Sequence, residues 1–237
     1  MRIIFPRYYL IPFLIAFLFS FAQGISALDL EITGKEVEAY YRNEYNRSFN
    51  YYGEFSTVGG MELNSLYNIK SGFSIGFSQG ITDIKLFTAA GIKPFKEIPL
   101  NFSLTWNYNG LPEYEAHTHT ILPVISYNAL RAGIAAGISF RFSSFFGEPA
   151  LFESIFSFSL YFNFINNEPL QIGIRCANYN DFIAGNLGSY SLCLYSKVNI
   201  SGNWSIINDI EVMQSGSIGL AANFYGIAWR TGAVFTW

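Results

Sequence analysis

Apolar and polar residues alternate along much of this chain. The segment Leu100–Asn109 reads L-N-F-S-L-T-W-N-Y-N, in which every second residue is apolar and the residues between are Asn, Ser or Thr. Successive side chains of a β-strand point to opposite faces, so this pattern predicts a strand with one apolar and one polar face. A helix would scatter the same apolar residues around its circumference and expose several of them to water.

The same alternation recurs along the rest of the sequence. It is clear at Leu130–Ser143 and at Phe152–Phe164. Weaker copies predict further strands at Leu170–Ala177, Tyr190–Asn199, Trp204–Val212, Ser217–Tyr225, Trp229–Trp237, Glu54–Asn64, Phe73–Ser78 and Asp83–Lys93, with Glu36–Arg42 as the beginning of the series. The chain is therefore expected to be all-β.

Turn signals separate these segments. Short ones are expected at Asn68–Gly72, Lys93–Pro99, Tyr127–Ala129, Asn166–Pro169 and Ser201–Asn203, and longer breaks at Asn109–Glu113, Phe145–Pro149 and Asn180–Ser189. Short connections that alternate with longer ones are typical of outer-membrane barrels, which have tight periplasmic turns and longer outer loops.

The size of the residues on each face distinguishes a membrane barrel from a soluble sandwich. In Leu130–Ser143 the face of Ile and Phe is too apolar for water, whereas the other face is too small to fill a sandwich core, because it carries Gly133, Ala135, Gly137 and Ser139. Lipid can cover the apolar face, and the polar face can line a narrow interior. A sheet in lipid must also close, since an open edge leaves backbone groups unpaired.

The predicted fold is a transmembrane antiparallel up-and-down β-barrel. We expect about twelve strands, within a range of roughly eight to fourteen. With the strand expected around His117 and His119, the segments come to thirteen if Glu36–Arg42 is included, whereas bacterial single-chain barrels normally have an even number of strands. Either Glu36–Arg42 is not a full strand, or Ser217–Trp237 is one long bent strand.

Composition and the first residues agree with an exported membrane protein. Hydrophobic residues make up 51% of the chain and charged residues only 13%, which is low for a soluble domain. Arg2 and Arg7 precede the apolar run Tyr8–Phe21 and a group of small residues, which indicates a secretory signal peptide over residues 1–24, cleaved between 24 and 27. A retained anchor is disfavoured by the short run. Residues 28–237 are expected to form the barrel.

The C-terminus resembles that of bacterial outer-membrane proteins. Phe235 and Trp237 stand at alternate positions of the last segment, and the chain ends in an aromatic residue. The resemblance implies a signal read by the outer-membrane barrel assembly machinery, a location in the bacterial outer membrane, and contact with membrane lipids. The Tyr- and Phe-rich strands also resemble spirochaete barrels of unassigned function. The net charge of −3, without a basic cluster, gives no reason to expect nucleic acid as a partner.

Charged residues on the polar face are expected to line the lumen. They are Glu62, Lys85, Glu115, Arg131, Arg141, Glu153, Arg175, Lys197, Asp209, Glu211 and Arg230. Because both signs are present, the predicted function is a narrow porin-like channel for small solutes or ions with little charge selectivity. The alternative is a structural or adhesive barrel whose lumen is plugged by salt bridges. Small residues along the Gly133–Ser139 stripe are expected to leave space for a water-filled path.

The segment Glu115–His119 contains both histidines of the chain. His117 and His119 are expected on one strand face, with Glu115 beside them, as lumen lining. Such a pair is a weak candidate for a divalent metal or a general base, and a barrel hydrolase is therefore a third reading. It is disfavoured, because Thr118 and Thr120 point to the opposite face and no G-x-S-x-G element occurs. We predict no enzyme activity and no cofactor.

The two cysteines are expected on opposite faces of neighbouring strands. Cys176 follows the apolar side of its segment, whereas Cys193 shares the polar side of the next. Residues on opposite faces of adjacent strands cannot form a disulfide, so both are predicted to be free thiols.

Overall fold

The structure, a computed structural model, describes most of the chain after its first residues. The described residues are 32–46, 51–95, 97–146, 148–180, 182, 189–215 and 223–237. The expected signal peptide, residues 1–24, lies outside them. No helix in the described part of the chain is long and apolar enough to cross a membrane.

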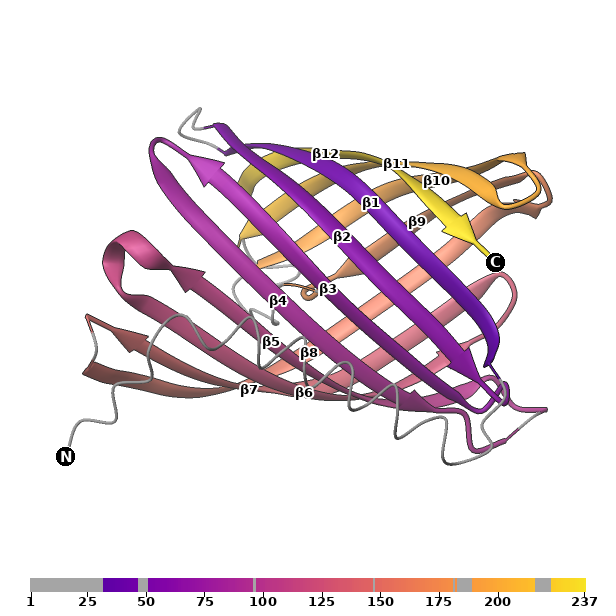
Figure 1. The fold of residues 1–237 in the computed structure, drawn as a ribbon, viewed down its shortest axis with the longest axis horizontal. Coiled ribbons are helices and arrows are strands. Elements are labelled where there is room, and N and C mark those ends of the chain that lie inside the picture. The colour runs from indigo at the N-terminus through magenta and orange to yellow at the C-terminus, as the bar shows by residue number, and fades with distance from the viewer. Residues whose placement is uncertain are drawn as a thin grey trace.

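Twelve strands form one closed, antiparallel barrel (Figure 1). They are β1 (Ile32–Asn46), β2 (Tyr51–Leu63), β3 (Tyr67–Ser78), β4 (Ile81–Ile92), β5 (Leu100–Leu111), β6 (Ala116–Asn128), β7 (Ala132–Phe145), β8 (Glu148–Asn167), β9 (Leu170–Ala177), β10 (Ser189–Ser201), β11 (Trp204–Ser215) and β12 (Asn223–Thr236). Each strand pairs with its neighbours in the chain, and β1 pairs with β12 to close the barrel. The predicted barrel, its topology and its strand number are confirmed.

The odd count of segments is resolved at both ends of the chain. Glu36–Arg42 belongs to β1, a full strand of 15 residues. The last strand, β12, contains Trp229–Thr236 together with the end of the expected segment Ser217–Tyr225, whose residues 217–222 lie outside the described part. One strand therefore stands where two were expected.

One local prediction was wrong, and alternation did not reveal one strand. Asn68–Gly72 is no turn, because it lies inside β3 and pairs with β2 in regular register. Strand β6 is not revealed by alternation, because Leu122 and Val124 are apolar and yet buried on its inner face. With apolar residues on both faces, the period-2 signal disappears.

The surface of the barrel is divided as the alternation predicted. Leu104, Ile134 and Phe156 are each about half exposed on the outer face, where lipid replaces water. On the inner face, Ser56 and Ser157 are fully buried. The closed arrangement satisfies the backbone hydrogen bonds of every strand without an open edge.

The two ends of the barrel differ in their connections. The C-terminus and the turns β2–β3, β6–β7, β8–β9 and β10–β11 share one end, here called the C-terminal end. The opposite end, here called the loop end, carries the 3-10 helix η1 (Pro112–Tyr114) and the long β9–β10 connection. The expected contrast of short and long connections holds only in part, because the loop end also has the tight β3–β4 turn after Ser78 and the C-terminal end has the longer β4–β5 connection.

Candidate pore through the barrel

Nine of the eleven charged residues that were predicted to line the lumen face the interior. The register pairs Arg175 with Cys193, which is 1% exposed, and Lys197 with Ile207, which is buried. Four more lie on the same inner faces of β7, β11 and β12: Arg141, Asp209, Glu211 and Arg230. The other inward charges named from the sequence, Glu62, Lys85 and Glu153, also take part in ion pairs inside the barrel.

Glu115 and Arg131 lie outside the lumen, contrary to expectation. Glu115 ends η1 at the loop end with a positive φ of 47°, and it is exposed. Arg131 lies in the exposed turn between β6 and β7. Both stand beyond the ends of the strands, where alternation no longer decides the direction of a side chain.

His117 and His119 face outward, which corrects their assignment to the lumen. His119 pairs with Tyr108 and His117 with Gly110, on the lipid-facing side of β5. Tyr108 Oη lies 3.0 Å from His117 Nδ1, and the Trp106 ring stacks on His119. The inner face of β6 consists instead of Thr118, Thr120, Leu122 and Val124. The prediction assumed that the more polar histidines would face the lumen, and this assumption was wrong.

The histidine pair has aromatic neighbours where a metal site needs further ligands. Among the described residues, no group of three or more His, Cys, Asp and Glu side chains is placed to hold a metal ion. Tyr and Trp beside His117 and His119 are typical of the interfacial aromatic belt of a barrel. The described neighbours of the pair are therefore aromatic side chains rather than further metal ligands.

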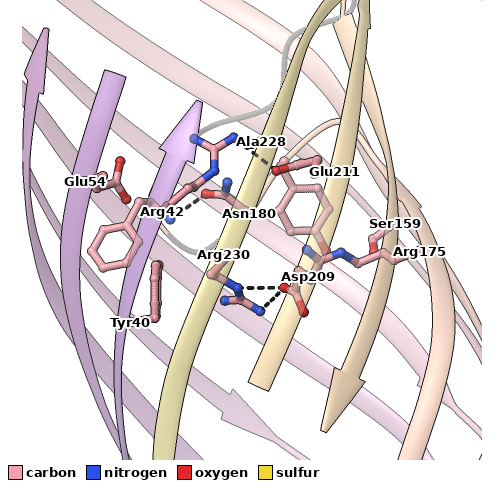
Figure 2. Close-up of a pocket in the computed structure, with 12 residues that line it drawn as sticks. Tyr40, Arg42, Glu54, Ser159, Arg175, Asn180, Asp209, Glu211, Ala228 and Arg230 are labelled. Carbon is pink, nitrogen blue, oxygen red and sulfur yellow. Dashed lines mark hydrogen bonds and ion pairs between the residues drawn. The ribbon is translucent and has the colours of Figure 1, made fainter. Parts of the chain in front are cut away.

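A buried ion network lies on the inner faces of the neighbouring strands β1, β12 and β11. Arg42 contacts Glu44 at 2.8 Å and Glu211 at 3.0 Å, and all three side chains are largely buried. Next to it, Arg230 pairs with Asp209, and its guanidinium lies 4.8 Å from the centre of the Tyr40 ring (Figure 2). Arg230 also pairs with Glu38 at 3.2 Å. Two nitrogens of Arg230 contact the same oxygen of Asp209, Oδ2, and these contacts together with the Tyr40 ring fix the arginine in place.

A second network lies on β2 and β4. Lys85 Nζ is 2.5 Å from Glu54 Oε2 and 3.0 Å from Asp83 Oδ2, and the Tyr52 hydroxyl donates to Glu54 Oε2 at 2.7 Å. Sequence reasoning named Lys85 but not Glu54 or Asp83. It also missed Glu38 and Arg42. A signal for the residues of β1 was present in the sequence. Its charged residues Glu36, Glu38, Arg42 and Glu44 all stand at even-numbered positions, which places them on one face of the strand.

An apolar layer also occupies the lumen. It consists of Tyr40, Val58, Phe87, Phe182, Ile207 and Val234. Phe182 comes from the β9–β10 connection and meets Phe87 edge to face, with 4.8 Å between ring centres. Asn178 holds the start of this connection against β8, because its Oδ1 accepts from Phe158 N at 2.7 Å and its Nδ2 donates to Phe156 O at 2.8 Å. The side chain of Phe182 thus occupies part of the lumen.

Cavities lie on both sides of the apolar layer. The smaller one, about 220 Å³, lies among the arginines and carboxylates toward the loop end, where Tyr40 and Phe182 border it (Figure 2). The larger one, about 810 Å³, opens at the C-terminal end, and Ala89 at its wall packs against the apolar layer. Tyr179 lines both cavities. Space therefore exists along the barrel axis, with the apolar layer between the two cavities.

The stripe of small residues does not form a path. A Cβ atom at Gly133 would clash with the Tyr161 ring, and one at Gly137 would clash with Pro123 O. Ser139 is fully buried and its hydroxyl lies 2.6 Å from that of Ser157. The small residues instead make room for neighbouring side chains and for close approach of the backbone, so the expectation of empty space there was wrong.

The cysteines and the C-terminal aromatics lie as the alternation predicted. Cys176 and Cys193 face opposite sides of the sheet and are both free. The Phe235 ring packs at a tilt against Trp204 on the outer face, with 4.8 Å between ring centres, and Trp237 N donates to Lys35 O at 3.1 Å. Recognition of these aromatics by the assembly machinery stays a prediction.

The fold is similar to solved bacterial outer-membrane barrels. The KdgM porin in complex with disordered oligogalacturonate matches with a TM-score of 0.56 at 6% identity, over 84% of this chain and 98% of that chain. The COG4313 outer membrane channel from Pseudomonas putida F1 matches with a TM-score of 0.56 at 7% identity, over 87% and 95%. The NanC porin matches with a TM-score of 0.54 at 10% identity, over 83% and 98%.

At these identities the likeness concerns the fold alone. No protein-family model and no curated protein matches the chain. The resemblance to spirochaete barrels stays a prediction. The closed sheet, the apolar outer face and the three neighbours together show that the chain folds as a bacterial outer-membrane β-barrel.

Proposed function

We propose that the protein is a narrow outer-membrane channel for small polar solutes. The observation that carries this proposal is the pair of cavities along the barrel axis, about 220 and 810 Å³, separated by one apolar layer. A twelve-stranded barrel lies between small barrels filled by side chains and wide aqueous porins. The fold shared with two porins and a channel supports the same class.

The lumen charges favour weak charge selectivity. Most of the inward carboxylates have a cation within 4 Å, as Glu54 has Lys85 and Asp209 has Arg230. A pore lined by rings of one sign selects ions of the other, whereas paired charges present little net field to a passing solute. Neutral solutes and small ions of both signs therefore fit this interior.

A plugged structural barrel is the second candidate, and the apolar layer favours it. Phe182 is 3% exposed and belongs to the same buried apolar cluster as Phe87 and Tyr40, so apolar side chains occupy this part of the lumen. Hydrophobic constrictions close pores by excluding water. In this reading the ion networks only stabilise the barrel.

An enzyme is not favoured by the geometry. The two histidines face lipid, whereas the Thr118 hydroxyl faces inward and lies 3.2 Å from that of Ser143. A His-activated nucleophile needs both groups within hydrogen-bond reach of each other. The prediction that the chain is no enzyme is therefore kept.

Single-channel conductance in planar bilayers tests the proposal. Phe182→Ala removes the ring that meets Phe87, and we expect a higher conductance than that of the unaltered barrel. Phe156→Ala is the matched control, because Phe156 lies on the outer face, and it should leave conductance unchanged. Folded protein without conductance in the unaltered and the Phe182→Ala forms, together with no solute-driven liposome swelling, would contradict the channel and favour the plugged barrel.

A further inference from the structure

Among the described residues, seven amide and hydroxyl side chains line the larger cavity. It lies at the C-terminal end of the barrel, and the contributing side chains come from β3, β5, β6, β12 and the β10–β11 turn: Asn68, Asn101, Ser103, Thr105, Asn128, Asn203 and Thr236. Each amide offers two N–H donors and an acceptor oxygen, and each hydroxyl is both donor and acceptor. The wall can therefore meet a partner that donates and accepts hydrogen bonds at many points.

The charged residues at this cavity are largely paired with one another. Lys93 Nζ lies 2.5 Å from Glu62 Oε1, and Lys70 Nζ lies 3.4 Å from Glu36 Oε1. Lys35 is the fifth charged residue that lines the cavity. It pairs with Met61 of β2 near the end of the barrel. Both carboxylates that line the cavity are therefore paired with a lysine. Lys35, near the end of the barrel, is the one charged residue of the described lining outside these two pairs.

The amides that face each other are only partly used. Asn68 Nδ2 donates to Asn101 Oδ1 at 3.2 Å, and Asn128 Nδ2 donates to Ser126 Oγ at 3.2 Å. These bonds orient the side chains and leave Asn68 Oδ1 and Asn101 Nδ2 available to a solute. A preoriented donor and acceptor pair suits two neighbouring hydroxyls of one molecule.

We propose that this cavity binds a neutral polyhydroxylated solute of the size of a sugar. The inference rests on the proposed function and names the class of solute. A cavity of about 810 Å³ is within the range of roughly 300 to 1,000 Å³ that is usual for small-molecule sites. A charged solute would lose its hydration in the cavity and would find no unpaired charge of the opposite sign deep inside it. The hydroxyl groups of a neutral solute can instead replace their hydrogen bonds to water with bonds to the amide and hydroxyl side chains.

Saturation-transfer NMR on the folded barrel in detergent tests binding apart from transport. The probes are glucose, glucuronate and glucosamine, which have similar sizes but differ in charge. We expect transfer to glucose and several-fold weaker transfer to the two charged sugars. Asn101→Leu should abolish most of the transfer to glucose. Asn208→Leu is the matched control, because Asn208 lies on the lipid-facing side of β11 between Ile206 and Ile210.

The outcomes separate the two proposals. Equal transfer to all three sugars, no transfer to glucose, or unchanged transfer in Asn101→Leu would overturn the inference, whether or not the barrel conducts. Glucose binding that depends on Asn101 in a barrel without conductance would support the binding site and contradict the channel. Circular dichroism of each variant confirms that the barrel is folded before it is compared.

Discussion

Lys85 illustrates at the scale of one residue how this lumen holds charge. Its side chain is 5% exposed and contacts two carboxylates, those of Glu54 and Asp83. A buried charge without a partner is costly, so each member of the group depends on the others. The Lys70–Glu36 pair differs, because both of its side chains are more than a third exposed.

We predict that Lys85→Met destabilises the barrel by about 3–5 kcal/mol, the usual cost of removing one partner from a buried pair. The physical reason is that Glu54 and Asp83 are left close together without a cation. Lys70→Met, at the exposed pair, should cost only about 0–1 kcal/mol. Urea unfolding in lipid vesicles measures both, and a similar cost for the two variants would contradict the buried network.

At the scale of one strand, the two faces have different surroundings. On β5, Leu104 is half exposed on the outer face, and its neighbour Thr105 lines the larger cavity. The buried serine pair Ser139–Ser157 shows that not every inner position has free space. A fair comparison of the two faces therefore needs an inner residue that borders a cavity.

Arg in place of Leu104 is predicted to destabilise the barrel by up to roughly 2–4 kcal/mol, because it places a charge in hydrocarbon. Thr105→Arg should cost much less, since its side chain can extend into the open cavity. The two substitutions differ by one position on the same strand. Equal loss of stability in vesicle unfolding experiments would mean that the faces of β5 are assigned wrongly.

At the scale of the whole molecule, closure of the sheet and its apolar exterior require a membrane. The outer face carries large hydrophobic residues on all sides, among them Phe55, Ile125, Ile134 and Leu194. Monomeric soluble proteins rarely expose apolar patches of such extent. Lipid contact is therefore part of the folded state.

The protein is predicted to sediment with the outer membrane and to resist extraction by carbonate. The reason is that removal of lipid would expose the apolar face to water. Fractionation of cells, followed by circular dichroism of the detergent-purified protein, is the measurement, with a β-rich spectrum expected. Recovery as a soluble periplasmic monomer would contradict the assignment of the outer face.

The sequence by itself determined the architecture, because period-2 alternation is a local property of a strand. Residues such as Phe102 and Leu104 have their face fixed by their immediate neighbours, and the same holds for Cys176 and Cys193. The signal is strongest where one face is wholly polar. From it follow the barrel architecture and nine of the eleven charged residues predicted for the lumen, although β6 has no such signal.

Tertiary structure decided what the lumen contains. The inner face of β6, the ion pair between Arg42 and Glu211, and the position of Phe182 all depend on contacts between residues far apart in the chain. Local polarity placed the histidines inside, although the registers of β5 and β6 turn them toward lipid. Alternation says which side of a strand is inward, but only closure of the barrel decides which side chains meet there and what space they leave.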